Sequence, residues 1–306
     1  MCKQFLAKLK SIAIQWLFEI AYKIKPRYAS DIMYRRAFHR KQNLDKPQDL
    51  IEKINWLQFN SDTSMWTICA DKYRMREYVE EKGYGDYLPK LYGHWENPEE
   101  IDFESLPNEF VLKSNNGCGT VKIVRDKTQL NVIETKKILK KWLKPYGYVG
   151  GQTHYLHIKP CIIAEELLFQ DEKQKTFSPD SMVDYKVWCI NGKPESILVV
   201  FNRHDALKVN IALFDTKWNE MPQHLQSTRL DVYDSNFVIP KPKSLSNMLS
   251  MATELAGSFP EVRVDFYEVD GKPVIGELTF TTGFGYFTYE YYKYLGDKID
   301  LSKIKS

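Results

Sequence analysis

The stretch from Val262 to Gly285, VRVDFYEVDGKPVIGELTFTTGFG, constrains the fold of this chain more than any other segment. Its first half alternates polar and apolar residues, and in an extended strand alternate side chains share a face. Arg263 and Asp265 therefore point to one side of the predicted strand, whereas Val264 and Phe266 point to the other. The pattern predicts one strand of a hairpin with a polar face and an apolar face.

The length of the turn after this strand decides whether two carboxylates meet. Glu277, on the returning strand, faces Asp265 only if the two residues lie opposite one another. A two-residue turn at 270–271 pairs Asp265 with Gly276, whereas a three-residue loop at 270–272 pairs Asp265 with Glu277. We therefore expect the three-residue loop or a β-bulge.

Paired carboxylates have a chemical consequence. They repel each other unless a cation or a proton lies between them. Hard oxygen ligands of this kind suit Mg²⁺, and the arginine on the same face suits a phosphate group. The alternative is an edge hairpin whose acidic side chains are solvated.

Charge is distributed unevenly along the 306 residues. The content of 43% hydrophobic and 27% charged residues is that of an ordinary globular protein with room for two or three lobes, which excludes disordered and fibrous classes. Net charge is only +3, yet residues 1–41 hold ten Lys and Arg against Glu19 and Asp31. The asymmetry predicts an anionic surface as partner of the N-terminus, and the slightly acidic remainder argues against nucleic acid.

Cysteine and histidine spacing gives no sign of a disulfide framework or a zinc site. The five cysteines are scattered, and no pair is spaced as CxxC. His154 and His157 are interpreted as core or surface residues rather than ligands. A reducing cytoplasm fits this composition best.

Residues 1–25 have the periodicity of an amphipathic helix. The apolar stretch is too short for a transmembrane helix, and no cleavage site of a secretory signal follows it. Two interpretations stay open. The helix could lie on the inner leaflet of a membrane, with Trp16 and Phe18 at the interface and lysines near the lipid phosphates. Alternatively, it could pack on the body of its own protein.

Residues 110–123, FVLKSNNGCGTVKI, predict a strand, a Ser/Asn/Gly loop and a second strand. Gly117 and Gly119 allow close backbone approach, so amide groups could face phosphate oxygens while Lys113 adds positive charge. The segment is not a Walker A loop, because it lacks GxxxxGK[ST] and leads into a strand. Phosphate binding here would use a hairpin flap, and the alternative is a plain hairpin with an Asn-Gly turn.

The remaining chain alternates between predicted helices and strands without repeats or long linkers. Lys72 and Arg76, four residues apart, are expected on one face of a charged helix, and this face is interpreted as solvated. Lobe boundaries are expected near Asp62 and Glu165. Helices are predicted in pieces over 29–57, from 70 to about 83, at 131–143 and at 245–258; strands are predicted at 158–168, 184–190, 196–200 and 211–214.

Taken in order, these segments resemble the ATP-grasp superfamily and its TupA-like branch, known from bacterial teichuronopeptide and surface-polysaccharide gene sets. The matching segments are ADKYRMR at 70–76, FVLKSNNGCG at 110–119, IIAEELL at 162–168, DYKVWCINGKP at 184–194 and the hairpin from 263 to 285. The resemblance implies an α+β fold in which two lobes clasp ATP. It divides the chain into a helical N-terminal segment (1–61), a lobe with the phosphate flap (62–164) and a lobe with the adenine hinge and metal-binding hairpin (165–306).

The resemblance also implies ATP and Mg²⁺ as cofactors and gives roles to matching residues. The flap and lysines that contact phosphates are Lys72, Lys113, Ser114, Asn116, Gly117, Gly119 and Thr120. The adenine hinge and the ribose-binding acid are Glu165, Glu166, Leu167 and Leu168, then Asp184. The magnesium ligands are Asp265 and Glu277, and the catalytic cations are Arg263, Lys113 and Lys72. Lys186 and Arg203 are further candidates for phosphate or substrate contact.

Two departures from the family pattern concern ligands and substrates. Thr279 stands where peptide-ligase relatives carry Asn, so a hydroxyl or a water would supply the third metal ligand. The Rossmann-like lobe that usually precedes an ATP-grasp core is replaced by about sixty largely helical residues, which leaves the acceptor surface undefined.

The reaction implied is ATP-dependent carboxylate–amine ligation through an acyl phosphate. The partners would be carboxylate and amine substrates: an amino acid or peptide and a uronic-acid sugar of a capsule, exopolysaccharide or teichuronopeptide. A kinase acting on a sugar or alcohol is an alternative with the same phosphate site. A third is a glycosyltransferase or its partner, which no DxD motif supports. The expected location is cytoplasmic, with attachment to the inner face of the membrane left open.

Overall fold

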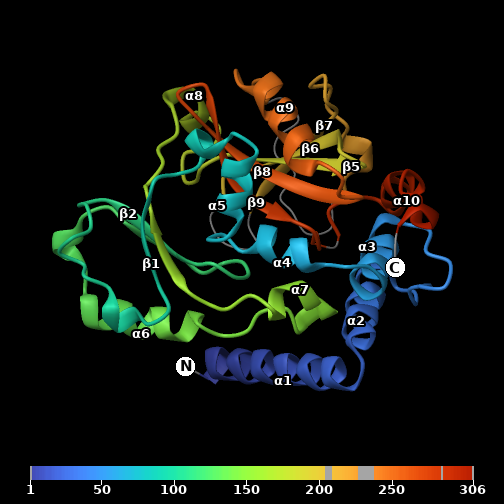
Figure 1. The fold of residues 1–306 in the computed structure, drawn as a ribbon, viewed down its shortest axis with the longest axis horizontal. Coiled ribbons are helices and arrows are strands. Elements are labelled where there is room, and N and C mark those ends of the chain that lie inside the picture. The colour runs from blue at the N-terminus through green and yellow to red at the C-terminus, as the bar shows by residue number, and fades with distance from the viewer. Residues whose placement is uncertain (1, 204–208, 227–237, 284, 305–306) are drawn as a thin grey trace.

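The computed structural model describes residues 2–203, 209–226, 238–283 and 285–304, with the backbone alone for residues 2–12. It has the predicted mixed α+β architecture, with two antiparallel sheets (Figure 1). The helices are α1 (Cys2–Ile24), α2 (Pro26–Phe38), α3 (Leu50–Asn60), α4 (Ser64–Ala70), α5 (Met75–Glu81), α6 (Val132–Trp142), α7 (Thr153–Leu156), α8 (Glu172–Lys175), α9 (Leu245–Ala256) and α10 (Tyr289–Asp297). The strands are β1 (Leu91–Trp95), β2 (Phe110–Ser114), β3 (Val121–Val124), β4 (Ile162–Glu165), β5 (Asp184–Ile190), β6 (Lys193–Phe201), β7 (Asn210–Phe214), β8 (Glu261–Val269) and β9 (Lys272–Thr279).

The larger sheet has the strand order β7-β6-β5-β8-β9 and carries the main core. One face is apolar along its length: Val187 and Val264 on neighbouring strands are fully buried in a cluster that includes residues of α4, α5 and α9. The alternation seen in the sequence explains this, since every second residue of a strand faces the same side. The predicted apolar face of 262–269 is therefore confirmed.

The other face of this sheet changes character along its strands. Trp188 and Ile190 of β5 pack against residues of α2, α3 and α10 in a second apolar cluster. Two and four residues earlier, on the same face of the strand, stand Lys186 and Asp184. The helices thus cover the apolar half of this face, and a polar half adjoins it.

A β-bulge sets the register of the β8–β9 hairpin. Asp270 and Gly271 both have positive φ, 51° and 74°, as a two-residue type I′ turn requires. Asp265 nevertheless pairs with Glu277, because Gly276 is an extra residue between Glu277 and the next paired position. Of the two arrangements expected from the sequence, the three-residue loop is wrong and the bulge is confirmed.

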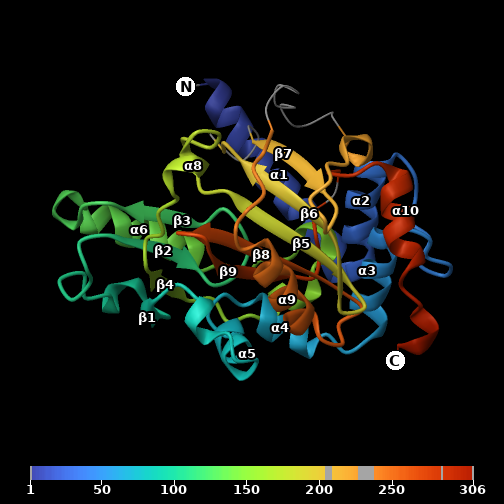
Figure 2. The same cartoon turned by 90° about the horizontal axis from the view of Figure 1, so that it is seen from above.

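The smaller sheet has the order β1-β4-β2-β3 and lies beside the larger one (Figure 2). Its core joins Phe110, Leu112 and Ile162 to Leu139 of α6. The predicted hairpin at 110–123 is present as β2 and β3, with the Ser/Asn/Gly segment as its connecting loop.

The segment before α5 differs from the prediction. Helix α5 begins at Met75, so Lys72 lies in the preceding turn and does not share a helix face with Arg76. The Asp71 carboxylate holds this turn by accepting hydrogen bonds from the backbone N–H groups of Tyr73 and Arg74 (2.9 and 3.2 Å). After this turn, Arg76 N and Glu77 N donate three residues back, to Tyr73 O (3.4 Å) and Arg74 O (3.2 Å), so a tighter turn precedes the regular α-helix.

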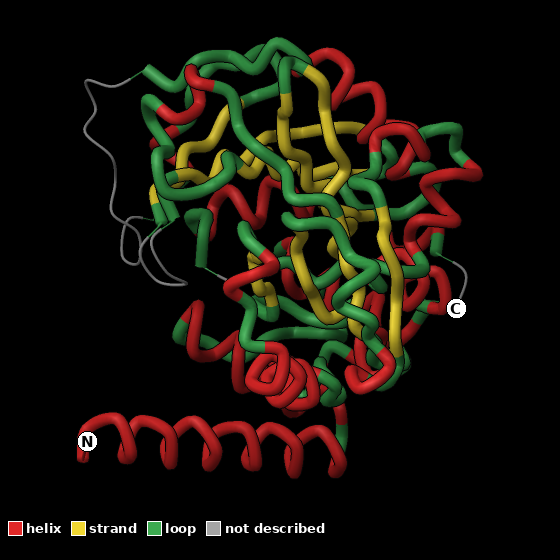
Figure 3. Tube along the Cα trace, turned by 90° about the vertical axis from the view of Figure 1, so that its left-hand side faces the viewer, coloured by secondary structure: helices red, strands yellow, loops and turns green. Residues whose placement is uncertain are grey.

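Helix α1 lies along one edge of the molecule, where it contacts α2 (Figures 1 and 3). Phe18 is buried and Trp16 is exposed. The expectation that both aromatic residues share an interface is wrong, because residues two apart are separated by about 200° around a helix. The apolar positions before residue 13 have side chains outside the described residues. Within the described part of the chain, no helix has the length and hydropathy of a membrane span.

Of the two histidines near α7, His154 is buried and His157 is exposed. The His154 ring packs against Trp66 (5.6 Å between centroids) and Tyr155, and neither ring nitrogen has a hydrogen-bond partner among the described residues. Burial lowers the pKa of His154 from 6.5 to about 3. The folded state therefore holds this imidazole neutral where the unfolded chain would protonate it.

We expect this histidine to make unfolding depend on pH. The neutral imidazole contributes fully to the free energy of unfolding above pH 6.5. This contribution is lost as the pH falls from 6.5 toward 3, since the unfolded chain then binds the additional proton. His154→Leu should flatten the pH dependence of the free energy of unfolding by up to about 1.4 kcal/mol per pH unit in that window. Urea unfolding between pH 7 and pH 5 measures it. The exposed control, His39→Asn, keeps a residue that tolerates the positive φ of 54° and should leave the slope unchanged, and equal slopes in all three proteins would contradict the prediction.

Candidate active site

Arg263 organises the polar half of the larger sheet. Its guanidinium forms a bidentate ion pair with the Asp265 carboxylate, in which Nε and Nη2 lie 2.6 and 2.7 Å from the two oxygens. Nη2 also donates to Glu277 at 3.2 Å and to the Thr279 hydroxyl at 3.1 Å. On its other side the guanidinium lies 5.3 Å from the Trp188 ring centroid, so it stands where the apolar core ends and the site begins.

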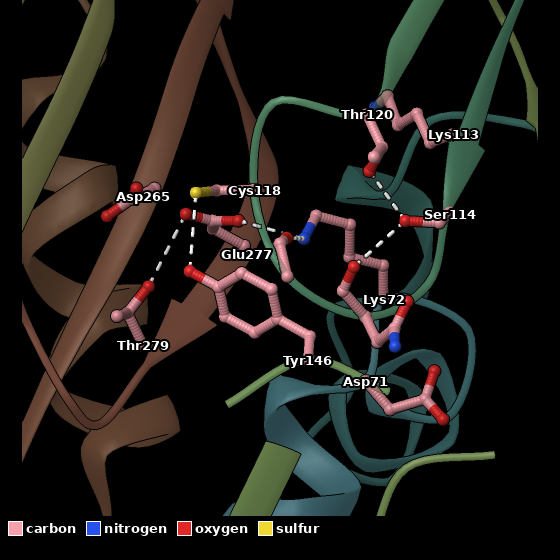
Figure 4. Close-up of polar contacts among 12 residues, drawn as sticks. Asp71, Lys72, Lys113, Ser114, Cys118, Thr120, Tyr146, Asp265, Glu277 and Thr279 are labelled. Atoms are coloured by element: carbon pink, nitrogen blue, oxygen red, sulfur yellow. Dashed lines mark hydrogen bonds and ion pairs between the residues drawn. The ribbon is translucent and has the colours of Figure 1, made fainter. Parts of the chain in front are cut away.

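Two lysines from outside the hairpin approach the same carboxylates. Lys186 Nζ, from β5, lies 2.5 Å from Asp265 Oδ2, which follows from the direct pairing of these residues across the sheet. Lys72 Nζ lies 3.3 Å from Glu277 Oε2, as Figure 4 shows. With Arg263, three cations therefore surround two carboxylates, and the cluster suits a polyanionic ligand.

The two carboxyl groups differ in their ionisation. Burial raises the pKa of Asp265, and the charges of Arg263 and Lys186 offset only part of that effect. Burial also acts to raise the pKa of Glu277, but Lys72, Lys186 and Arg263 together outweigh it and hold this pKa below its usual range. Glu277 is therefore a firmly ionised carboxylate at neutral pH.

The residues present fit a magnesium ion shared with phosphates. Glu277 has a side-chain exposure of 31%, so its carboxylate is open on one side, and Asp265 is its direct cross-strand partner. Among the described residues no group of three or more His, Cys, Asp or Glu forms a metal cage. Magnesium commonly takes one or two protein carboxylates and completes its shell with phosphates and water. Thr279 lies beside Glu277 (3.4 Å), and its part as a third ligand stays a prediction.

A second ion-pair cluster lies on the smaller sheet. Glu165 of β4 is buried and receives Lys113 Nζ at 2.7 Å and Arg76 Nη1 at 3.3 Å. A carboxylate between two cations fixes the Lys113 side chain at the base of the loop it introduces. The interpretation of Arg76 as part of a solvated face is wrong, because Glu165 lies across the fold from it and no local pattern reveals the pair.

The Ser/Asn/Gly loop is ordered by its own side chains and by Lys72. The Ser114 hydroxyl lies 2.5 Å from that of Thr120 and donates to Asn116 O at 2.8 Å. Lys72 Nζ donates to Gly117 O at 2.7 Å, so one ammonium joins this loop to the Glu277 carboxylate of the larger sheet (Figure 4).

Gly117 is packed against an aromatic ring that the sequence did not single out. A Cβ added at Gly117 would lie 2.6 Å from Cδ2 of Tyr146, whereas one added at Gly119 would meet nothing within 4 Å. Tyr146 also contacts Cys118 of the loop (Sγ to hydroxyl 3.5 Å). A Tyr in an irregular segment carries no motif, so tertiary contact alone reveals its place at the loop.

A cavity of about 480 Å³ lies beside these groups, between the β2–β3 hairpin and the segment after β4. Its walls include apolar side chains that are otherwise unusual at a surface, Val121 (50% exposed), Ile123 (53%) and Phe169 (48%). Lys113 stands at its border. Of the predicted hinge, Glu166, Leu167 and Leu168 line the cavity, while the Glu165 side chain is engaged with Lys113 and Arg76.

Asp184 and Arg203 form a pair near the same end of the larger sheet. Arg203 Nη2 lies 3.0 Å from Asp184 Oδ2, and Lys186 Nζ lies 3.8 Å from that oxygen. The charge of Asp184, followed by burial, raises the pKa of the Tyr267 phenol, which borders the cavity. Asp184 is thus a partly buried acid that adjoins Tyr267 at the border of the cavity, and its part in binding ribose stays a prediction.

A glycine-rich hairpin loop, lysines that approach it from two elements, and paired carboxylates on a second antiparallel sheet are the arrangement of the ATP-grasp class. The chain belongs to the TupA-like ATP-grasp family, whose family model matches residues 52–300. The membership confirms the resemblance seen in the sequence. It also confirms the α+β fold and the prediction that the chain is an ATP-grasp enzyme.

Solved structures similar to this chain include several ligases. D-alanine–D-alanine ligase from Bacillus anthracis, complexed with ATP, is 16% identical with a TM-score of 0.47, and the match covers 78% of this chain and 67% of that one. L-amino acid ligase from Bacillus licheniformis is 16% identical with a TM-score of 0.42, and the match covers 72% of this chain and 44% of that one. The ADP complex of N5-carboxyaminoimidazole ribonucleotide synthetase is 14% identical with a TM-score of 0.43, and the match covers 75% of this chain and 50% of that one. The chain thus spans between 44% and 67% of the length of these three structures. No curated protein sequence matches the chain.

The packing of Gly117 on Tyr146 gives a test of the loop. Gly117→Ala and Gly119→Ala both place a side chain at positive φ (75° and 77°), but only the first also forces a Cβ into a ring. We expect Gly117→Ala to weaken Mg-ATP binding about tenfold more than Gly119→Ala, since overpacking costs about 1–3 kcal/mol. Isothermal titration calorimetry measures the difference.

Removing the ring tests the cause. In the Tyr146→Ala background the two glycine variants should bind Mg-ATP with similar affinity, which is a double-mutant cycle. If the difference between the two variants persists without the ring, Tyr146 does not position the loop.

Proposed function

We propose that this ATP-grasp enzyme is a carboxylate–amine ligase that works through an acyl phosphate. The observation that carries the proposal is the group of three cations, Lys72, Lys186 and Arg263, around the carboxylates of Asp265 and Glu277. Such a cluster suits a magnesium-bound triphosphate. The phosphate oxygens would become the partners of Lys186 and Arg263, which would release the Asp265 and Glu277 carboxylates to hold the metal.

We assign the ATP base to the apolar cavity and its phosphates to the loop. Val121, Ile123 and Leu168, which line the cavity, would contact the faces of adenine. Asp184, which adjoins Tyr267 at the cavity border, would accept a hydrogen bond from ribose. From there the phosphates would extend toward Gly117 and Gly119, whose positive φ angles suit close backbone approach to an anion. Lys113 lies at the border between the two regions.

Each residue has a defined task in the transfer. A carboxylate oxygen of the substrate attacks the γ-phosphorus, the bond to the bridging oxygen breaks, and ADP leaves. Lys72 and Arg263 would neutralise the charge on the transferring group. Magnesium, when held by Asp265 and Glu277, would supply further charge neutralisation on the phosphates.

The second half of the reaction forms the new bond. The amine nitrogen attacks the acyl carbon, the carbon–oxygen bond to phosphate breaks, and the amine gives up a proton as the amide and free phosphate are released. The loop at 114–120, packed on Tyr146, would exclude water that otherwise hydrolyses the acyl phosphate. The fixed charges that act on the transferring group, those of Lys72 and Arg263, each typically change the rate by about a hundredfold or more.

The substrates we propose are an amino acid or peptide and a uronic-acid sugar of a surface polymer. What supports them is membership of the TupA-like family rather than a feature of the site. We propose a cytoplasmic location, which agrees with the free thiols of Cys69, Cys118, Cys161 and Cys189.

An ADP-release screen tests the site together with the substrates. Uronic-acid oligosaccharides crossed with amino acids should give ADP above the ATP-only background for at least one pair. Asp265→Asn with Glu277→Gln should lower that rate at least a hundredfold, because the phosphates lose their metal ligands. Asp270→Asn, in the turn of the same hairpin and away from the cluster, is the matched control and should keep full activity.

Activity that survives in the double variant would reject Asp265 and Glu277 as the metal site.

The acyl phosphate distinguishes a ligase from a kinase. Hydroxylamine, supplied in place of the amine, should trap the intermediate as a hydroxamate and release one phosphate for each ADP. A kinase would instead leave the phosphate on a sugar or alcohol acceptor and form no hydroxamate. Phosphorylated acceptor without hydroxamate, measured by mass spectrometry, would replace the ligase proposal by the kinase.

A further inference from the structure

Helix α1 presents a row of large apolar side chains to solvent. Ile14, Trp16, Leu17, Ile20 and Ile24 are 46%, 66%, 57%, 49% and 70% exposed. Single exposed apolar residues are ordinary, but a contiguous group on one helix marks an interaction site.

Four of these five side chains share one side of the helix, and Ile14 lies outside it. At 100° per residue, Trp16, Leu17, Ile20 and Ile24 fall within an arc of about 100°. The body of the protein is reached from the opposite side, where Phe18 is buried and the Tyr22 ring lies 5.4 Å from that of Tyr148. Figure 3 shows the helix at the edge of the fold, alongside the body rather than within it. One face of the helix therefore packs on the body of the protein, and the opposite face is exposed.

Charge identifies the kind of surface that covers the apolar row. Residues 1–41 hold ten Lys and Arg against two acidic residues. Lys23, Lys25 and Arg27, which are exposed, flank Ile24 at the end of the row, and Lys23 also pairs with Glu19 at 2.8 Å. A second copy of this chain would bring the same positive charges against them, whereas an anionic surface would be attracted.

We infer that α1 docks this protein on a lipid bilayer that contains anionic lipids. Trp16, Leu17, Ile20 and Ile24 enter the boundary between headgroups and acyl chains, and the lysines and arginines contact lipid phosphates. Phe18 and Tyr22 keep the helix attached to the body, so the active site is held at the membrane surface. The inference is independent of the reaction that the enzyme catalyses.

Vesicle co-sedimentation of the full chain tests this docking. We expect binding to vesicles of phosphatidylcholine with phosphatidylglycerol, and at least tenfold weaker binding to phosphatidylcholine alone. Trp16→Ser with Ile20→Ser should weaken binding to the anionic vesicles at least tenfold. The matched control is Val132→Ser with Ile133→Ser, an exposed apolar pair on α6, which should bind as the unaltered protein does.

Two further measurements keep the result unambiguous. Thermal unfolding of the Trp16→Ser, Ile20→Ser protein should match that of the unaltered protein, since both side chains are exposed. Lys23→Gln, Lys25→Gln and Arg27→Gln together should weaken binding to anionic vesicles at least tenfold without changing binding to neutral ones.

Two results would overturn the inference. One is equal vesicle binding by the apolar-face variant and the unaltered protein. The other is a dimer, seen by sedimentation velocity, that the Trp16→Ser, Ile20→Ser variant dissolves, because a second copy would then cover the face.

Discussion

The buried bidentate ion pair between Arg263 and Asp265 is the interaction on which the rest of the site depends. Taking two charges out of water costs free energy, and only close geometry with further hydrogen bonds offsets that cost. Here both oxygens of the carboxylate are engaged, at 2.6 and 2.7 Å, and Lys186 approaches one of them from the neighbouring strand. Removing any of these charges would leave another buried with one partner fewer, so the polar half of the sheet behaves as one unit.

The way in which helices cover the larger sheet explains where the site lies. Helices α4, α5 and α9 contribute to a core along one face, whereas α2, α3 and α10 cover only the apolar half of the other. Trp188 lies at the boundary between the apolar half and the polar half of this face. It packs in the second core, and the Arg263 guanidinium lies over its ring. The helical N-terminal segment thus has a structural task in burying this sheet, and its first helix has a further face that the fold leaves exposed.

Much of the architecture could be predicted because its signals are local. Period-two alternation identifies β8 and β9, and because the side chains alternate, Asp265 can face Glu277 only if the hairpin has a bulge or a loop with an odd number of residues. The loop at 114–120 was recognised because glycine and asparagine have local backbone preferences. By contrast, spacing alone places Lys72 and Arg76 on a single helix face, because it does not reveal the tighter turn of i→i+3 hydrogen bonds that precedes α5.

The sequence by itself determined which residues alternate, which loop can approach an anion, and which strands carry charge, since each is a property of neighbouring residues. Only the tertiary structure decided that Lys72 links the Gly117 carbonyl to Glu277, that Glu165 lies between Lys113 and Arg76, and that Tyr146 supports the loop. Each of these contacts joins segments far apart in the chain. Their partners are fixed by how two sheets and their helices pack, and no local pattern encodes that packing.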